Sequence, residues 1–132
     1  TSHLAEVVRD AIPAATRRRG GHPAKRTFQA IRIEVNAELD RLGDALDEAV
    51  RRLVPTGRGV VLSYHSGEDR IVKHCFDRAA TGGCKCPRRL PCACGAIPLA
   101  VLPRRAGRVP SEDEARDNPR AASARLRMLE HR

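Results

Sequence analysis

The 132-residue sequence has very few aromatic side chains: one tyrosine, two phenylalanines and no tryptophan. A core with so little aromatic volume must be built from Val, Leu, Ile and Ala, which limits the apolar area that each side chain buries. Long hydrophobic runs are also absent, because no segment approaches the roughly 18 apolar residues that a membrane-spanning helix needs. No charged-then-apolar leader opens the sequence. We therefore expect a cytosolic (cytoplasmic) protein of modest stability, with no membrane partner.

Several functional motifs are missing as well. There is no Gly-x-Gly-x-x-Gly after a predicted strand, no Walker loop, no serine or cysteine nucleophile motif and no aromatic face of the RNP type. The residues therefore contain no recognisable cofactor cradle.

Positive charge is what the sequence has in excess. The 25 Lys and Arg residues against 16 Asp and Glu leave a net charge of +9. Arginine makes planar bidentate contacts with phosphate groups, so RNA or DNA is the first expected partner. A solvated basic surface is the alternative.

Apolar residues recur at helical spacing in three segments. Residues 1–12 predict a short amphipathic helix, and a basic loop rich in glycine and proline follows over 13–27. Residues 28–53 give the clearest pattern, either one long helix or two shorter ones separated at Gly43-Asp44. A third helical period ends at the Gly82-Gly83 pair.

Three segments predict strands. Val60–Tyr64 is too short for a helix and apolar on both faces, which is typical of a buried strand, and we expect it to pair in parallel. A helix, a tight turn and such a strand form the second half of a βαβ unit. Ile97–Leu102 and Ala124–Glu130 predict two further strands. Between them, Ser111–Glu114 has the form of a capping box and predicts a brief helix.

Four of the five cysteines lie close together in the sequence. They are Cys84, Cys86, Cys92 and Cys94, and Cys75 stands apart. Such thiols can converge on one zinc ion, whose tetrathiolate charge Lys85, Arg88 and Arg89 would offset. The one-residue gaps are tighter than usual for zinc, so a thiol-bearing surface loop is the alternative, and a reducing compartment disfavours disulfides. A four-ligand site would act as a structural clip.

Polar residues gather at the carboxyl end of the predicted buried strand, over Ser63–Arg70. In open α/β sheets, ligands bind beyond the carboxyl ends of the strands. His65, Ser66 and Asp69 are therefore candidate catalytic residues that would orient a substrate or move a proton. In the structural alternative, Ser66 or Asp69 caps the helix and the histidine only packs.

A cationic set lies on the main helix and after the buried strand: Lys25, Arg26, Arg32, Arg70 and Lys73. If the helix and the loop pack side by side, these residues can converge on an RNA backbone. Unpaired surface charge is the alternative.

Four separated segments carry a family resemblance. They are His22–Ile33, Val35–Leu39, Ser63–Lys73 and Asn118–Arg127. In this order they resemble the MraW (RsmH) family of bacterial methyltransferases, which modify N4 of a cytosine in small-subunit ribosomal RNA. The sequence departs from the family pattern at Gly67, where the family has Leu, and at Thr56, which replaces a Gly.

The resemblance implies the fold class: α/β, the C-terminal part of a Rossmann-like class I S-adenosylmethionine-dependent methyltransferase sheet. Residues 1–27 would be the end of an inserted helical, substrate-recognition subdomain. Residues 28–132 would be the C-terminal part of the methyltransferase domain, with a Cys-rich insertion at about 82–96 and a closing β-hairpin near 97–102 and 123–130.

The resemblance also implies the cofactor and the partners. S-adenosylmethionine would bind in an N-terminal half that has no counterpart here, so no cofactor-binding residue is assigned and the isolated chain is expected to be inactive. Small-subunit ribosomal RNA, or the ribosomal subunit, would be the substrate. His65, Ser66 and Asp69 would shape the nucleotide side of the site, while Lys25, Arg26 and Arg70 would hold phosphates.

Three hypotheses follow from the sequence. The first is a methyltransferase fragment whose exposed strand edge is covered by the missing N-terminal half or by a second copy. The second is a zinc-stabilised, non-catalytic RNA-binding module that folds alone. The third is an inert truncated product.

Overall fold

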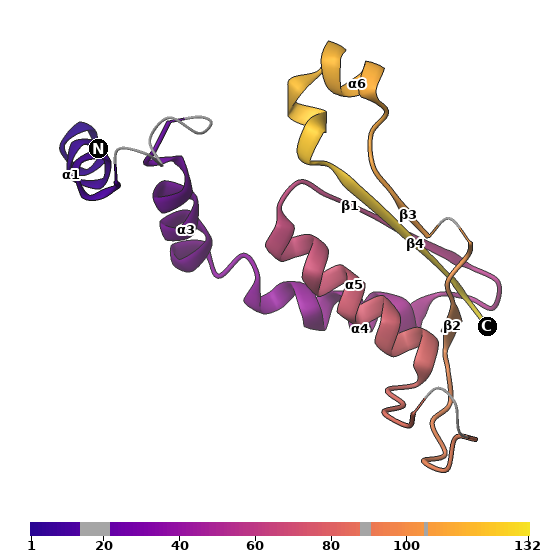
Figure 1. Ribbon diagram of the computed structural model, residues 1–132. Coiled ribbons are helices and arrows are strands. Elements are labelled where there is room, and N and C mark those ends of the chain that lie inside the picture. The colour runs from indigo at the N-terminus through magenta and orange to yellow at the C-terminus, as the bar shows by residue number, and fades with distance from the viewer. Residues whose placement is uncertain (14–21, 88–90, 105) are drawn as a thin grey trace. The chain divides into compact units, whose positions relative to one another are not determined.

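The computed structural model describes residues 1–13, 22–87, 91–104 and 106–132 (Figure 1). The chain divides into two compact units, Thr1–Glu38 and Leu39–Arg132. Among the described residues, none of the helices combines the length and the apolar character that a membrane crossing needs.

The described residues of the first unit form two helices, α1 (Ser2–Ala11) and α3 (Lys25–Asn36). The first confirms the predicted amphipathic helix. The second begins three residues before the predicted start, so the end of the expected loop is helical, and the rest of that loop lies largely outside the described residues. At the end of α3, Ala37 adopts a left-handed conformation with φ 49°, and its N–H donates to the carbonyl of Glu34.

In the part of the second unit that the structure describes there are three helices, one 3-10 helix and four strands. They are α4 (Asp40–Arg52), β1 (Arg58–Ser63), α5 (Ser66–Thr81), β2 (Ala100–Val101), β3 (Gly107–Arg108), α6 (Glu112–Asp117), η1 (Pro119–Ser123) and β4 (Arg125–His131). The break in the predicted long helix therefore lies at residues 37–39. The expected break at Gly43-Asp44 is wrong, since both residues lie inside α4.

The sheet is built around β4. This strand pairs antiparallel with β1 on one side, in the register Val61↔Arg127, and antiparallel with β2 and β3 on the other (Figure 1). The pairing of β2 with β4 matches the predicted closing hairpin, and β3 was not expected from the sequence. The predicted parallel pairing of β1 is not found among the described residues, because the partner of β1 there is antiparallel β4.

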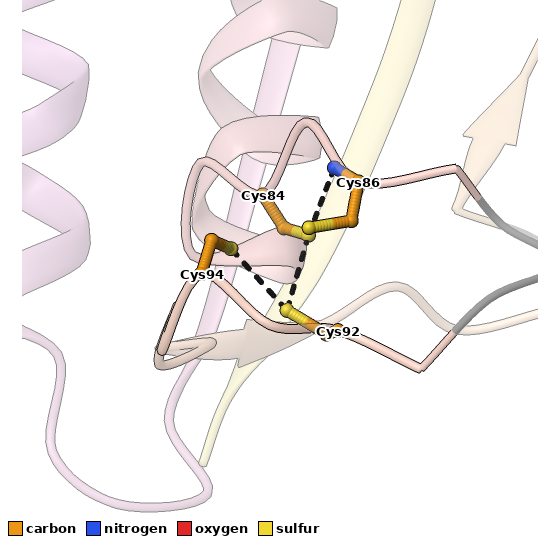
Figure 2. A group of neighbouring side chains, drawn as sticks. All are labelled: Cys84, Cys86, Cys92 and Cys94. Atoms are coloured by element: carbon orange, nitrogen blue, oxygen red, sulfur yellow. Dashed lines mark hydrogen bonds between the residues drawn. The ribbon is translucent and has the colours of Figure 1, made fainter.

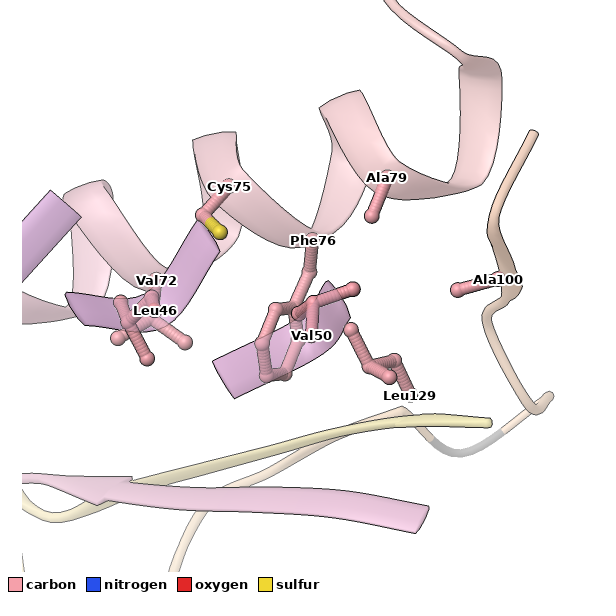
Figure 3. Packing of buried hydrophobic residues seen from close by; sticks show 8 residues of the cluster. All are labelled: Leu46, Val50, Val72, Cys75, Phe76, Ala79, Ala100 and Leu129. Carbon is pink, nitrogen blue, oxygen red and sulfur yellow. The ribbon is translucent and has the colours of Figure 1, made fainter. Parts of the chain in front are cut away.

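The helices α4 and α5 cover one face of this sheet. The core contains residues from both helices and from two strands: Leu46, Val50, Val72, Cys75, Phe76, Ala79, Ala100 and Leu129 (Figure 3). Val60 and Leu62 point away from it and are 56% and 51% exposed. The expectation that β1 is buried on both faces is therefore wrong for this chain, because the described helices pack against only the Val61 face.

Candidate functional site

His65 is the N-cap of α5, two residues after the end of β1. Its Nδ1 accepts a hydrogen bond from the backbone N–H of Gly67 at 3.1 Å, and the Glu68 carboxylate accepts from the backbone N–H of His65 at 3.2 Å. This reciprocal arrangement is a capping box. The cap is therefore His65 and not Ser66 or Asp69, which the structural alternative had favoured; Ser66 is exposed in the first turn.

The cap determines what the imidazole can do. A neutral imidazole has one acceptor and one donor nitrogen, so an accepting Nδ1 leaves the proton on Nε2. The half-buried His65 ring can therefore offer an N–H donor to a ligand while it holds the helix start.

Asp69 is held by an arginine that the sequence analysis missed. Arg127 Nε donates to Asp69 Oδ1 at 2.7 Å and Arg127 Nη2 donates to Oδ2 at 2.9 Å. These hydrogen bonds lower the pKa of Asp69 against the opposing effect of burial. The carboxylate therefore stays ionised, and both of its oxygens are engaged in joining α5 to β4.

The five cationic candidates fall into two groups, and all are exposed. Lys25, Arg26 and Arg32 lie on α3 in the first unit, where Arg32 also donates to Glu38 at 3.1 Å. Arg70 and Lys73 lie on α5 in the second unit. Their convergence on one RNA backbone stays a prediction.

The four clustered cysteines come together in space, as their spacing predicted (Figure 2). The Sγ atoms of Cys84, Cys86, Cys92 and Cys94 all lie within 4.8 Å of one another. Cys92 Sγ lies 3.4 Å from Cys84 Sγ and 3.2 Å from Cys94 Sγ, and the backbone N–H of Cys86 donates to Cys84 Sγ. All four are free thiols, so this cysteine group could bind a metal ion.

The thiols polarise one another. Hydrogen bonds from the side chain and the backbone of Cys94, together with Cys84, lower the pKa of Cys92 to about 6. The backbone N–H of Cys86 lowers the pKa of Cys84. The hydrogen bonds that the Cys84 thiol makes with Cys92 and Cys94 outweigh this effect and raise the pKa of Cys84 to about 12. One thiol of the group is thus readily ionised at neutral pH. Lys85 is exposed beside them, whereas Arg88 and Arg89 lie outside the described residues.

The backbone of Gly82 lies close to that of Ile97 at the base of the loop that carries the four cysteines. Gly82 has φ +63°, and a Cβ added there would lie 2.6 Å from the carbonyl carbon of Ile97. Beyond Ile97, the backbone N–H of Leu99 donates to the carbonyl of Ala79 at 2.9 Å. The two arms of the loop therefore meet at the end of α5, directly before β2.

Cys75 takes no part in the group. It is buried in the core, and its thiol donates to Asp47 Oδ1 at 2.9 Å. Burial, and then the Asp47 carboxylate, raise the pKa of Cys75 to about 12. Asp47 also accepts a hydrogen bond from Arg78, and this side-chain cluster joins α4 to α5. A thiol in this state is a poor nucleophile and a poor metal ligand.

Matches to known proteins extend over the whole chain or nearly all of it. Residues 1–132 match the family model described as the MraW methylase family. Three similar proteins are named ribosomal RNA small subunit methyltransferase H: those of Heliobacterium modesticaldum (53% identical), Pelobacter propionicus (50%) and Acetivibrio thermocellus (47%). Each match extends over 131 residues, which are 98% of this chain and 42% of the relative. The chain thus spans about two fifths of the length of the curated relatives that it matches.

Proposed function

Because the chain belongs to the MraW methylase family, we propose that it is the C-terminal part of a methyltransferase acting on N4 of a cytosine in 16S ribosomal RNA. The observation that carries this proposal is the match of nearly the whole chain, at 47–53% identity, to relatives named for ribosomal RNA methylation. A ribosomal RNA substrate, free or in the small subunit, would put this activity in the cytoplasm.

The proposed cofactor is S-adenosylmethionine, which would supply a methyl group bound to a positively charged sulfur. We propose that its site lies in the N-terminal part of the complete protein, because the relatives are more than twice as long as this chain. No described residue is assigned to it. A structural zinc ion on the four clustered thiols completes the cofactors we propose, and a four-ligand site would leave no open position for catalysis.

The proposed fold of the complete protein is a Rossmann-like class I sheet of which β1 and β4 form one end. Val60 and Leu62 support this, since two apolar side chains on one face of β1 are exposed here. In the complete protein, the N-terminal part would cover that face and pair with the other edge of β1. We keep residues 1–27 as the proposed end of an inserted helical subdomain and residues 28–132 as the C-terminal part of the methyltransferase domain.

The start of α5 is the proposed nucleotide side of the site. The lone pair of the cytosine amine is delocalised into the ring, so the enzyme must hold N4 in line with the methyl group and accept hydrogen bonds from the amine. The exposed Ser66 hydroxyl is a suitable acceptor, and His65 Nε2–H is a suitable donor to a ring nitrogen or carbonyl. Asp69 would position this turn through Arg127.

The cationic residues would serve the RNA backbone. We propose that Lys25, Arg26, Arg32, Arg70 and Lys73 contact phosphates, which supply most of the affinity for RNA and make it sensitive to salt. The target base must also leave any stack before it can react.

Calorimetric binding of S-adenosylmethionine tests whether the cofactor site lies in the N-terminal part of the complete protein, outside the 132 residues. We expect the purified 132-residue chain not to bind S-adenosylmethionine. The complete gene product, which contains these 132 residues, should bind the cofactor and methylate small-subunit RNA. Stoichiometric cofactor binding by the 132 residues alone would contradict this location of the site. RNA binding without methylation by the complete product would favour the zinc-stabilised binding module.

The substitution His65→Asn tests the proposed site, because asparagine retains a helix cap while it removes the imidazole. In the complete enzyme we expect slower single-turnover methylation, with cofactor binding and the unfolding midpoint nearly unchanged. Arg116→Gln, on the exposed surface of α6, is a control for a polar change outside the site. Unaltered turnover in His65→Asn would remove this residue from the site.

A further inference from the structure

We propose that the four clustered thiols bind one zinc ion that clips the end of α5 to the segment leading into β2. The ligands are Cys84, Cys86, Cys92 and Cys94. Such a zinc site is independent of methyl transfer, because the ion only helps to hold the second unit together.

The spacing of the sulfur atoms fits a zinc ion. A tetrahedral site with Zn–S bonds of about 2.3 Å places its sulfurs about 3.8 Å apart. Here all four sulfurs lie within 4.8 Å of one another, and the two hydrogen-bonded pairs are 3.4 and 3.2 Å apart. The required separation falls between these values, so small side-chain rotations suffice to form the tetrahedron.

The donor set selects the kind of metal. Four soft sulfur ligands without a carboxylate suit zinc and exclude magnesium or calcium as the preferred ion. The bound group would carry two net negative charges. The backbone N–H of Cys86, which already points at Cys84 Sγ at 3.4 Å, and the exposed Lys85 beside it would offset part of that charge.

A disulfide is a weaker explanation of the same group. Cys92 lies near two partners, Cys84 and Cys94, and a covalent bond with one leaves the other without its contact. Both distances are also well above the S–S bond length of about 2.05 Å. One ion satisfies all four sulfurs at once.

The position of the loop gives the ion its structural effect. The first pair of cysteines follows the end of α5, and the second pair precedes Ile97, whose backbone contacts Gly82. Shortly beyond lies Ala100, which is fully buried in the core on the two-residue strand β2. A strand this short has few hydrogen bonds of its own. Joining the two arms of the loop through metal lowers the entropy lost when β2 docks.

Metal content is the first test, made on the complete gene product purified without chelators. We expect one zinc per chain, and cobalt in its place should give the intense visible absorption of a tetrahedral cobalt thiolate. Cys92→Ser should lose the zinc. Cys75→Ser is the matched control, because it removes a thiol outside the group and should retain the metal. A zinc-free protein without a cobalt spectrum, or a mass showing a disulfide, would overturn the proposal.

Hydrogen exchange on the native sequence tests the clip without any substitution. Removing zinc with a chelator should abolish the protection of the Leu99 and Arg132 amides, which hydrogen-bond to the carbonyls of Ala79 and Leu99. The Asp69 amide, bonded to the carbonyl of His65 at the other end of α5, should keep its protection. Bound zinc with unchanged protection at Leu99 would overturn the clip. Loss of methylation alone, with zinc and protection intact, would bear only on the proposed enzyme function.

Discussion

Asp69 and Arg127 form a two-point ion pair, with both carboxylate oxygens accepting from the guanidinium at 2.7 and 2.9 Å. The pair joins the first turn of α5 to β4 and keeps the turn that carries His65 at the end of β1. Only 20% of the Asp69 side chain and 26% of the Arg127 side chain are exposed. Water screens such a pair less than it screens a surface ion pair.

This ion pair should make stability depend on pH. The pKa of Asp69 is lower in the folded protein than its usual value near 3.9, so its contribution is fully present above about pH 4 and is lost as the pH falls through the folded value. We expect Asp69→Asn to lower the free energy of unfolding by about 1–3 kcal/mol at pH 7, and by less at acid pH. Urea unfolding at a series of pH values measures this difference.

The control for this prediction is Glu48→Gln. Glu48 pairs with Arg51 and Arg52 on the exposed surface of α4, where an ion pair contributes little. Its substitution should barely move the urea midpoint at pH 7. An Asp69→Asn effect that does not shrink below pH 4 would show that packing, and not charge, is the source of the destabilisation.

Two neighbouring glycines should respond differently to a methyl group. Both have a left-handed backbone, with φ +63° at Gly82 and +74° at Gly83, but only Gly82 faces the backbone of Ile97. Gly83→Ala should lower the free energy of unfolding by about 1 kcal/mol through backbone strain alone. Gly82→Ala adds a clash, so we expect about 2–4 kcal/mol. Thermal unfolding of both variants checks this, and equal midpoints would exclude the close contact.

The two faces of the sheet should differ in their sensitivity to truncation. Leu129 is fully buried among α4, α5 and β2, so Leu129→Ala should lower the free energy of unfolding by about 2–5 kcal/mol. Leu62→Ala removes the same atoms from an exposed position on the neighbouring strand and should change it by less than about 0.5 kcal/mol in the 132-residue chain. Denaturant titration measures both. In the complete protein, Leu62→Ala becomes destabilising if the proposed N-terminal part covers this face.

Much of the local structure could be predicted because its signals are local. The glycine pair that ends α5 and the serine that caps α6 act within a few residues of themselves. The helix break was placed wrongly, since Ala37 takes the left-handed conformation for which glycine is the usual signal, while Gly43 lies within α4. The strand that pairs with β1 could not be predicted from neighbouring residues, because residues that face each other across the pair, such as Arg58 and Glu130, are 72 residues apart in the sequence.

The candidate sites show the same division. The cysteine group could be predicted from spacing, because residues so close in sequence are close in any compact loop. The role of Arg127 could not be predicted from the sequence. It depends on the pairing of Arg127 with Val61, which puts the guanidinium on the face of the sheet that the helices cover. A charge there needs a partner, and Asp69 supplies it. Once the register is known, alternation along the strand would have identified this arginine.

Thr56 has a strained backbone at a position where the family resemblance leads us to expect glycine. It has φ 64° in the turn before β1, and its backbone N–H donates to the carbonyl of His131. A β-branched residue is disfavoured in this conformation, so Thr56→Gly should raise the free energy of unfolding by up to about 1 kcal/mol. Thr56→Ala, which keeps a Cβ, should gain less. Melting temperatures of the three proteins test this, and a lower value for the glycine variant would contradict the strain.

The central place of β4 affects when the sheet forms during protein synthesis. Arg58 on β1 and Glu130 on β4 are 72 residues apart, so at about 5–20 residues per second the ribosome adds the partner strand roughly 4–14 s later. Through that interval the edge of β1 that pairs with β4 stays open, although the proposed N-terminal part, made earlier, can already cover Val60 and Leu62. The nascent chain is therefore most vulnerable to self-association before its last described strand has left the ribosome.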